Sequence, residues 1–194
     1  FDLFLKTEAG LCRNTIVRYM KCFKRITNMA LAKEWMRKDP FYGYKMAQDE
    51  TDPVFLTYPE LKSIMEKEFT IPRLALVRDI FVFAAFTGLA FANVSTLTKD
   101  NLVQDNNGDW WIRKGRVKLE RRHRASSVCN IPLLPVPLAI LKKYEEHPIC
   151  RKKSLCLPVI CNQRMNSYLK EIADLCNIRK NLTTHTAKHS KIYI

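Results

Sequence analysis

Glycine is scarce in this sequence, with five among 194 residues, and no apolar run approaches the roughly 18 residues that a membrane span requires. Because hydrophobic residues make up 47% of the chain, its composition argues against a disordered protein and for a real core. Residues 1–5 are neither preceded by a basic stretch nor followed by a signal-peptide cleavage site. The first residue is not Met, from which we expect a trimmed or mature fragment. We therefore predict a folded, cytoplasmic protein without a membrane partner.

The cysteines do not follow the common zinc or disulfide patterns. There are seven, an odd number, and no two form a C-x-x-C pair. Four residues could be imagined as zinc ligands, namely Cys150, Cys156, Cys161 and His185. Their spacing matches no standard ligand pair, so reduced thiols packed in or near a core are expected instead. We predict neither a metal site nor a cofactor.

Acidic residues are outnumbered, with 19 Asp and Glu against 33 Lys and Arg, which makes the formal net charge +14. Such an excess favours a polyanionic partner, because each phosphate that Lys or Arg neutralises releases condensed counterions. We predict nucleic acid as this partner, since the positive charge is clustered along the chain. The alternative is a soluble basic protein with no such partner.

The first 48 residues have a helical pattern. Apolar side chains at spacings of three and four predict one buried helix face, formed by Ile16, Tyr19, Cys22, Phe23 and Ile26. Three cations share the other face, and we predict that they contact DNA phosphates: Arg18, Lys21 and Arg25. A merely solvated basic face is the alternative.

Capping and turn residues divide the chain into segments. Asn14 is expected to cap the first long helix, and a second helix is expected over about residues 29–37. The polar, acidic residues 49–55 have the composition of a linker between domains. Thr57 and Glu60 then form a capping-box pattern that opens a new helix.

The remaining segments predict the fold class. Residues 74–87 are apolar on nearly all sides, which predicts a buried helix that ends at Gly88. A short helix is expected from about Asn93 to Leu97. Residues 102–104, 109–113 and 128–132 change to a strand pattern with a turn between the first two. Further helices are expected at about 137–147, 162–175 and 184–190. We predict a mainly α-helical protein with a small three-stranded antiparallel β-sheet.

The strongest local signal is a basic hairpin at residues 113–124, where seven of 12 residues are Lys or Arg and one is acidic. A hairpin tip this basic cannot lie in a core, so we predict backbone contacts to DNA rather than a merely solvated loop. The contacting residues would be Arg113, Lys114, Arg116, Arg121 and Arg122. Lys118 lies on the same hairpin, where a lysine that reaches into DNA could protonate a leaving oxygen.

A second signal is the segment 182–189, with the sequence LTTHTAKH. Thr184 could cap a helix that starts at His185, and His185 and Lys188 are three residues apart and therefore share a face. A phosphate at this helix end would also meet unpaired backbone N–H groups. A His-x-x-Lys pattern is weak by itself.

Several short segments, taken in their order along the chain, resemble the tyrosine recombinases carried by mobile elements of Bacteroides-type bacteria. The segments that carry the resemblance are 55–57 (FLT), 86–89 (FTGL), 116–118 (RVK), 131–134 (IPLL), 162–166 (NQRMN) and 182–189. Residues 14–41 are similar to the core-binding domain of these proteins. The order and spacing of the segments make the resemblance specific.

The resemblance implies a C-shaped clamp on duplex DNA, with a helical core-binding domain at residues 1–48, a linker at 49–55 and a catalytic domain of the DNA breaking-rejoining fold at 56–194. Such enzymes nick one strand with a tyrosine, form a 3′-phosphotyrosyl link and pass it to another duplex, without metal or nucleotide. They act as an oligomer on DNA, a tetramer in the intact family. By motif position, Lys118 would be the general acid, His185 would donate to the phosphate, and Lys188 would occupy the second arginine position.

Two departures weaken the implied site. Ala90 occupies the first arginine position, and Asn93 replaces the usual acidic residue three places later. Lys188 keeps the charge of an arginine but loses its bidentate fork on phosphate. Removing one important transition-state donor typically costs about 10²–10³ in rate. A non-catalytic DNA-binding regulator on the same fold is therefore the alternative function, and a basic RNA-binding protein is a weaker one, because no RNP-type stacking motif is present.

The family's nucleophile lies on helices beyond the point where this sequence ends, so we expect a C-terminally truncated, incomplete or inactive form. Tyr193 follows Lys188 by five residues and would point about 140° away from it on a continuous helix. It cannot then be the nucleophile. If residues were missing after His189, this assignment would reverse.

Overall fold

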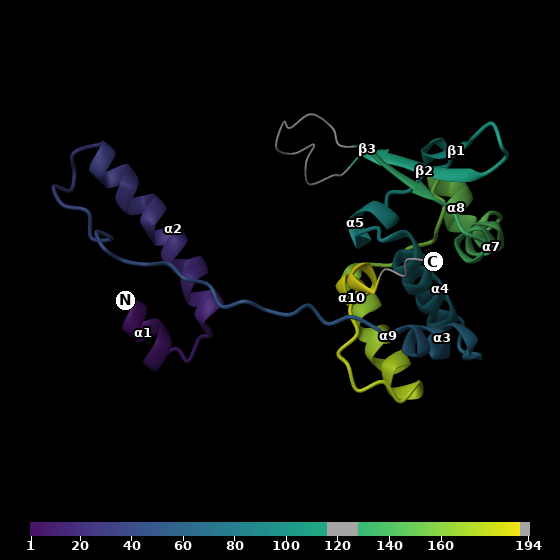
Figure 1. Cartoon of the computed structure of the whole chain (residues 1–194), viewed down its shortest axis with the longest axis horizontal. Helices are drawn as coiled ribbons and strands as arrows, with labels where there is room; N and C mark the ends of the chain where they lie inside the picture. Colours follow the sequence, from purple (N-terminus) through teal and green to yellow (C-terminus); the bar gives the residue numbers. More distant parts are fainter. Residues whose placement is uncertain (116–127, 191–194) are drawn as a thin grey trace. The chain divides into compact units, whose positions relative to one another are not determined.

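The computed structural model describes residues 1–115 and 128–190, which divide into two compact units, Phe1–Asp52 and Pro53–Ile194 (Figure 1). Each unit has its own group of buried hydrophobic side chains. None of the helices in these ranges is both long and apolar enough to cross a membrane. The Lys118 general-acid prediction, the Tyr193 assignment and the predicted DNA contacts of Arg116, Arg121 and Arg122 fall on residues outside these ranges.

The first unit consists of α1 (Asp2–Thr7) and the long helix α2 (Arg13–Ala32). Its small core joins Leu5 of α1, Ile16 and Met20 of α2, and Phe41 from the segment after α2. The prediction of the buried face of α2 was partly wrong, because α1 and Phe41 pack on the side of the helix that carries Ile16 and Met20. Tyr19 and Ile26 are 46% and 59% exposed as a result.

Both ends of α2 differ from the sequence prediction. Asn14 does not cap the helix, which begins at Arg13 with Cys12 as its N-cap. The Asn14 side chain instead exchanges two hydrogen bonds with the backbone of Asp49, at 3.0 and 2.9 Å. No second helix forms over residues 29–37. The chain turns at Glu34, which has a φ of 59°, and the N–H of Trp35 donates to the carbonyl of Ala30 at 2.9 Å. These are the features of a Schellman-type helix end, which the amino-acid types did not reveal.

The second unit is built around α4 (Pro72–Thr87), which is buried over most of its surface, as predicted. Helix α3 (Tyr58–Glu66) precedes it and begins as expected, with the Glu60 carboxylate accepting hydrogen bonds from the N–H and hydroxyl of Thr57 at 2.7 and 2.9 Å. Gly88 ends α4 in the left-handed region, with a φ of 66°. Only a residue that tolerates positive φ fits this position without strain.

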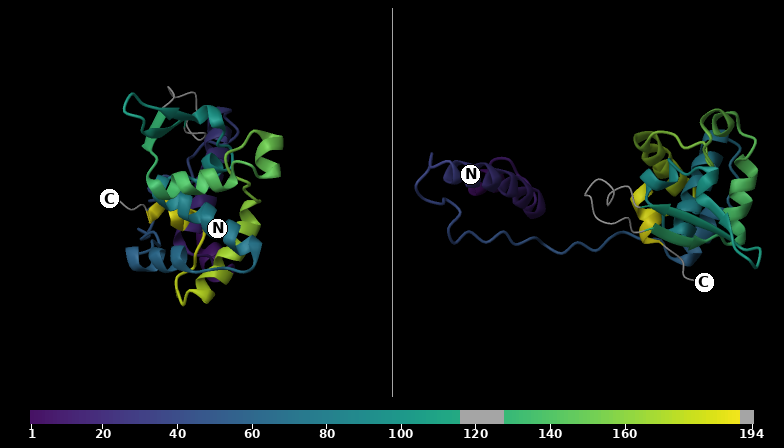
Figure 2. Two further views of the ribbon diagram at one scale, coloured as in Figure 1. Left: turned by 90° about the vertical axis from the view of Figure 1, so that its right-hand side faces the viewer. Right: turned by 90° about the horizontal axis from the view of Figure 1, so that it is seen from above.

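The sheet is antiparallel, with the strand order β1 (Leu102–Gln104), β2 (Trp110–Gly115) and β3 (Val128–Pro132). In its register, Ile112 of β2 pairs with Leu102 on one side and Ile131 on the other, and Ile112 is fully buried. The sheet lies at one end of the unit and α9 at the other (Figure 1, Figure 2). The predicted fold class, mainly helical with a small three-stranded antiparallel sheet, is confirmed.

The second unit contains further elements besides α3, α4 and the sheet. They are α5 (Phe91–Val94), the 3₁₀ turn Lys99–Asn101, α7 (Pro135–Tyr144), α8 (Pro148–Lys153), α9 (Asn162–Leu175) and α10 (Thr184–His189). Helices α3, α7, α9 and α10 all contact α4. Helix α8 was not foreseen as a separate element, and α5 starts two residues earlier than expected.

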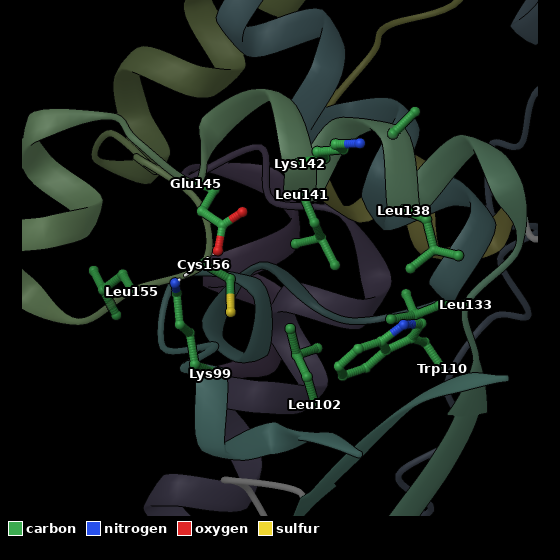
Figure 3. A pocket seen from close by; sticks show the side chains of 11 residues that line it. Lys99, Leu102, Trp110, Leu133, Leu138, Leu141, Lys142, Glu145, Leu155 and Cys156 are labelled. Carbon is green, nitrogen blue, oxygen red and sulfur yellow. Dashed lines mark hydrogen bonds and ion pairs between the residues drawn. The ribbon is translucent and has the colours of Figure 1, made fainter. Parts of the chain in front are cut away.

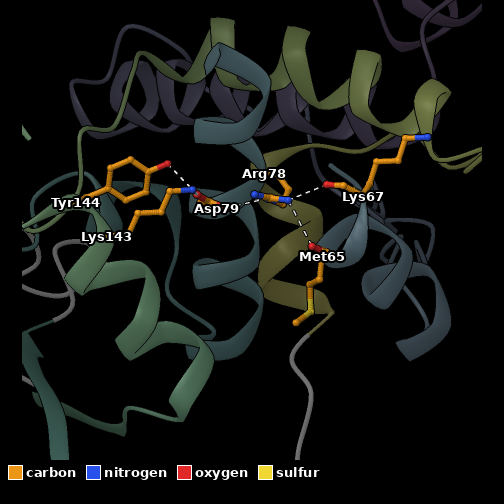
Figure 4. Close-up of polar contacts among 6 residues, drawn as sticks. All are labelled: Met65, Lys67, Arg78, Asp79, Lys143 and Tyr144. Carbon is orange, nitrogen blue, oxygen red and sulfur yellow. Dashed lines mark hydrogen bonds and ion pairs between the residues drawn. The ribbon is translucent and has the colours of Figure 1, made fainter. Parts of the chain in front are cut away.

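A buried carboxylate connects α4 to α7 (Figure 4). Asp79 of α4 is 5% exposed and accepts hydrogen bonds from three side chains. The donors are Arg78 Nε at 2.7 Å, Lys143 Nζ at 2.7 Å and Tyr144 Oη at 2.8 Å. Because each Asp79 oxygen is satisfied by charged or hydroxyl donors, the buried charge is compensated.

Candidate nucleic-acid interface

The short helix α10 carries two of the predicted site residues and is capped by its own sequence. Thr183 is the N-cap: its hydroxyl accepts from the N–H of Thr186 at 3.3 Å, and its own N–H donates to the Thr186 hydroxyl at 3.2 Å. The prediction that Thr184 caps the helix was therefore wrong by one residue. The reason is that the Thr183–Thr186 pair satisfies two backbone donors reciprocally, as in a capping box.

Helix α9 supplies a second support for the start of α10. The backbone N–H of Thr184 donates to Asn166 Oδ1 at 2.9 Å, and the Thr184 hydroxyl donates to Asn162 Oδ1 at 2.8 Å. The N–H groups of Thr184 and Thr186 are thus engaged within the protein. The expectation that a phosphate would meet a set of unpaired N–H groups here is corrected accordingly.

The exposed side of α10 presents three cationic or titratable side chains, His185, Lys188 and His189, while Thr186 and Ala187 are buried beneath them. The Nε2 atoms of His185 and His189 lie 2.9 Å apart, and the two ring centroids are separated by 4.5 Å. A hydrogen bond between two imidazole nitrogens needs one donor and one acceptor, so at least one ring is neutral at that nitrogen. Because the two Nε2 atoms engage each other, a ring N–H donated to an anion would come from an Nδ1 atom, on the same exposed side of α10 as Lys188.

Two cations of the basic hairpin, Arg113 and Lys114, lie within the described residues, and their surroundings differ. Arg113 of β2 is exposed. Lys114 is half-buried, and its ammonium contacts the carbonyl of Thr96 and also Asn101 Oδ1, at 3.1 Å. This ammonium thus serves contacts within the protein, and the DNA contact predicted for Lys114 stays a prediction.

The three predicted phosphate-binding cations of α2 are all exposed and lie on one side of the helix. Lys21 Nζ donates to Gln48 Oε1 at 3.1 Å, which ties it to the segment after the helix. Arg18 has its guanidinium carbon 5.7 Å from the centroid of the neighbouring Tyr19 ring. Both contacts are at the surface, so these cations remain accessible to an anionic partner.

Ala90, two residues after the α4 cap Gly88, carries no charge. Ala90 is the N-cap residue of α5 and is partly buried, and Asn93 lies within the same four-residue helix, where its N–H donates to the Ala90 carbonyl at 2.8 Å. The first arginine that the resemblance implies thus has no substitute at this position. Any phosphate charge must be met by other residues.

A separate pocket of about 560 Å³ lies between the sheet and α7 (Figure 3). Its walls are mostly apolar, with Trp110 along one side, and a Lys99–Glu145 ion pair at 2.9 Å closes one side of it. Cys156 directs its sulfur into the pocket, and burial raises the pKa of this thiol to about 11, so it stays protonated. Among the described residues, none of those predicted to be catalytic or to bind DNA lines this pocket.

The 162–166 segment contributed to the resemblance without a predicted role, and Asn162 and Asn166 were not predicted as supports of α10. Their spacing of four residues, which places both on one face of a helix, was the available signal. Within residues 1–115 and 128–190, no group of three or more His, Cys, Asp or Glu side chains is arranged to hold a metal ion.

Comparisons with known proteins agree with this architecture. Residues 1–46 match the family model of the phage integrase SAM-like domain. No curated protein sequence matches the chain.

Several solved structures share the fold. The Tn1549 transposon integrase (residues 82–397), solved in complex with circular intermediate DNA, is 18% identical over 97% of this chain and 68% of that chain, with a TM-score of 0.67. A lambda integrase dimer bound to a core site is 12% identical over 90% of this chain and 60% of that chain, with a TM-score of 0.66. The XerH site-specific recombinase bound to its difH substrate is 19% identical over 71% of this chain, with a TM-score of 0.53. The match spans 41% of the XerH chain.

Proposed function

We propose that this chain, which combines a phage integrase SAM-like domain with the fold of the tyrosine recombinases, binds duplex DNA and takes part in site-specific recombination. One observation carries the proposal: 97% of the chain, including the SAM-like segment, aligns with an integrase solved on DNA. In this proposal residues 1–48 are the core-binding domain, 49–55 the linker and 56–194 the catalytic domain. Assembly into an oligomer on DNA stays a prediction.

Exposed cations support DNA as the ligand. Arg18, Lys21 and Arg25 form a basic row on α2, and Arg113 and Lys188 are exposed in the second unit. With a net charge of +14, the chain is suited to binding that depends on counterion release. Arg116, Arg121 and Arg122, which lie outside the described residues, are also predicted to contact DNA.

Helix α10 is the proposed phosphate site. His185 would donate a hydrogen bond to a non-bridging phosphate oxygen, and Lys188 would neutralise charge without the bidentate grip of arginine. Lys118 would protonate the leaving oxygen. No nucleophile is assigned among the described residues.

A second function, a DNA-binding regulator that does not cleave, is favoured by Ala90 and Lys188 at the two arginine positions. A nicked suicide substrate distinguishes the two functions, because a cleaving protein becomes covalently attached to DNA. A denaturant-resistant protein–DNA adduct would establish cleavage. Duplex binding without an adduct would support the regulator.

The basic row on α2 can be tested through the salt dependence of duplex binding. The double substitution Arg18→Ala and Arg25→Ala removes two phosphate contacts, so the slope of log affinity against log salt should fall by about 2. Lys62→Ala is the matched control, because Lys62 lies on α3 and pairs with Glu66 at 3.6 Å. Gel shifts at a series of salt concentrations give the slopes. Equal slopes for the double variant and the wild type would remove α2 from the interface, and no salt-sensitive duplex binding at all would refute the proposed function.

A further inference from the structure

Helix α10 is too short to form without tertiary support. It has six residues, and isolated helices below roughly 12–15 residues are marginal in water. Its far end is held by Ser190, whose hydroxyl donates to the Thr186 carbonyl at 2.8 Å and accepts from the Leu56 N–H at 2.7 Å. Its first turn is capped by the Thr183–Thr186 pair and is also contacted by α9.

Asn162 and Asn166 hold that first turn from α9. Both use the side-chain carbonyl oxygen, and both bind the same residue, Thr184. Asn166 takes the backbone N–H and Asn162 takes the hydroxyl, so the position of the peptide and the rotamer of the side chain are both restrained. His185 follows Thr184 directly, and its direction therefore depends on this peptide.

The surroundings of Thr184 make the asparagines hard to replace. A small cavity beneath the residue is lined by apolar side chains that include Phe81, Met165 and Ala187. The Thr184 N–H points instead to Asn166, which is half-buried. If the amide oxygen were removed, a partly buried donor would lose its partner beside an apolar wall, which disfavours the helical turn.

We propose that Asn162 and Asn166 are positioning residues that fix the first turn of α10 and thereby aim the His185 imidazole at the DNA phosphate. The inference rests on the proposed function, since it names the groups that organise its phosphate site. Asn166 contributes more to this positioning than Asn162, because the backbone N–H that it binds cannot rotate to find another acceptor. Asn162 restrains a hydroxyl, which can rotate toward water.

Four variants separate this role from general stability. Asn166→Leu removes the acceptor at similar volume, Asn166→Asp keeps it, and Thr184→Val removes only the hydroxyl. Gln163→Leu is the matched control, because it makes the same amide-to-leucine change at an exposed position of α9. Two readouts apply to each variant of the 194-residue chain: the ring ¹⁵N signals of His185 and His189 by NMR, and duplex affinity.

The expected result is specific to Asn166. In Asn166→Leu the first turn frays, the two rings separate, and their signals move toward those of isolated exposed imidazoles. Its duplex affinity falls about tenfold, the loss of one hydrogen bond to a charged group. Asn166→Asp and Gln163→Leu keep the wild-type ring signals, and Thr184→Val shows a smaller displacement than Asn166→Leu.

Wild-type ring signals in Asn166→Leu would overturn the proposal, as would equal displacement in Gln163→Leu. If Asn166→Leu fails to fold, the loss of its thermal unfolding transition will show it. In that case Thr184→Val and Asn166→Asp test the proposal. Unchanged rings in Thr184→Val, or displaced rings in Asn166→Asp, would then refute it. If the wild-type chain binds no duplex DNA, the proposed function fails, while the ring signals still test the positioning role.

Discussion

Asp79 shows at the residue scale how one side chain can join two helices of the second unit. Its carboxylate is nearly inaccessible to solvent, yet three donors from α4 and α7 surround it. Of these donors, Tyr144 is the most buried, at 8% exposure. Burial, together with the hydrogen bond to Asp79, raises the pKa of the Tyr144 hydroxyl, so it remains a donor throughout the accessible pH range.

Tyr144→Phe should therefore reduce the free energy of unfolding by about 1.5–3 kcal/mol, the usual contribution of a hydrogen bond to a charged group. The Lys143 and Arg78 contacts would still compensate the carboxylate, so the fold should persist. Urea unfolding of the wild type and the variant measures the difference. Tyr58→Phe, at a position that is 58% exposed, should change little. Equal effects of the two substitutions would show that the Asp79 contact contributes no net stability.

Lys188 is the residue that stands where the resemblance implies the second arginine. It is exposed on α10, three residues after His185, where both side chains face solvent. An ammonium is a point charge with rotatable donors, whereas a guanidinium grips two phosphate oxygens in a fixed plane. At the proposed phosphate site, Lys188 would therefore neutralise phosphate charge but hold the phosphate geometry less firmly than an arginine.

At the scale of elements, the ends of helices determine where the site residues lie. Helix α4 ends at Gly88, whose N–H donates to the Ala84 carbonyl at 2.9 Å. The left-handed turn redirects the chain into α5, which holds Ala90 at its N-cap. Helix α10 is likewise defined at its start by Thr183 and α9.

A side chain at position 88 should be costly for the same reason. Gly88→Ala places a Cβ in the left-handed region and should lower the free energy of unfolding by about 1–2 kcal/mol. Gly88→Asn should cost less, because asparagine tolerates this conformation better than alanine. Thermal or urea unfolding of both variants gives the comparison. An alanine variant as stable as the asparagine variant would mean that backbone strain is absent at this turn.

At the scale of the whole molecule, a few polar contacts close the second unit over long sequence separations. The backbone of Leu56, at its beginning, is bonded to Ser190 at its end. Lys180 Nζ donates to Glu60 Oε2 at 2.7 Å and so joins the segment before α10 to α3. These contacts position α10 relative to the rest of the unit.

The Glu60 contact should make stability depend on pH. Burial alone would raise the pKa of Glu60, but hydrogen bonds from Lys180 and Thr57 outweigh it and the pKa is lowered. A lowered folded-state pKa means that the stabilisation is fully present above the ordinary glutamate pKa of about 4.3 and is lost as the pH falls through the folded value. Because the pair is partly exposed, its contribution should stay below about 1 kcal/mol.

Glu60→Gln should therefore be less stable than the wild type at pH 6, with the difference shrinking as the pH falls below about 4. Glu66→Gln is the control, since Glu66 is 68% exposed in its pair with Lys62 and should show little pH-linked change. Urea unfolding at a series of pH values measures both. A difference for Glu60→Gln that stays constant with pH would contradict the assigned ion pair.

The sequence by itself determined the fold class and most of the elements of the second unit. The β1–β3 strands, the buried helix α4, the Thr57–Glu60 cap and the Gly88 helix end all follow from periodicity and local conformational preference, which act over a few residues. The pattern of 182–189 likewise located α10 and placed His185 and Lys188 on one exposed face. The roles of these residues, and those of the hairpin cations, remain predictions.

Only the tertiary structure decided which face of α2 is buried, because amphipathic spacing does not say where α1 and Phe41 will pack. It also decided that Lys114 turns toward Thr96 and Asn101 rather than outward. Most of all, it brought Asn162 and Asn166 onto Thr184 across 22 and 18 residues of chain. Such contacts depend on how two helices meet in space, and no local property of either segment encodes that meeting.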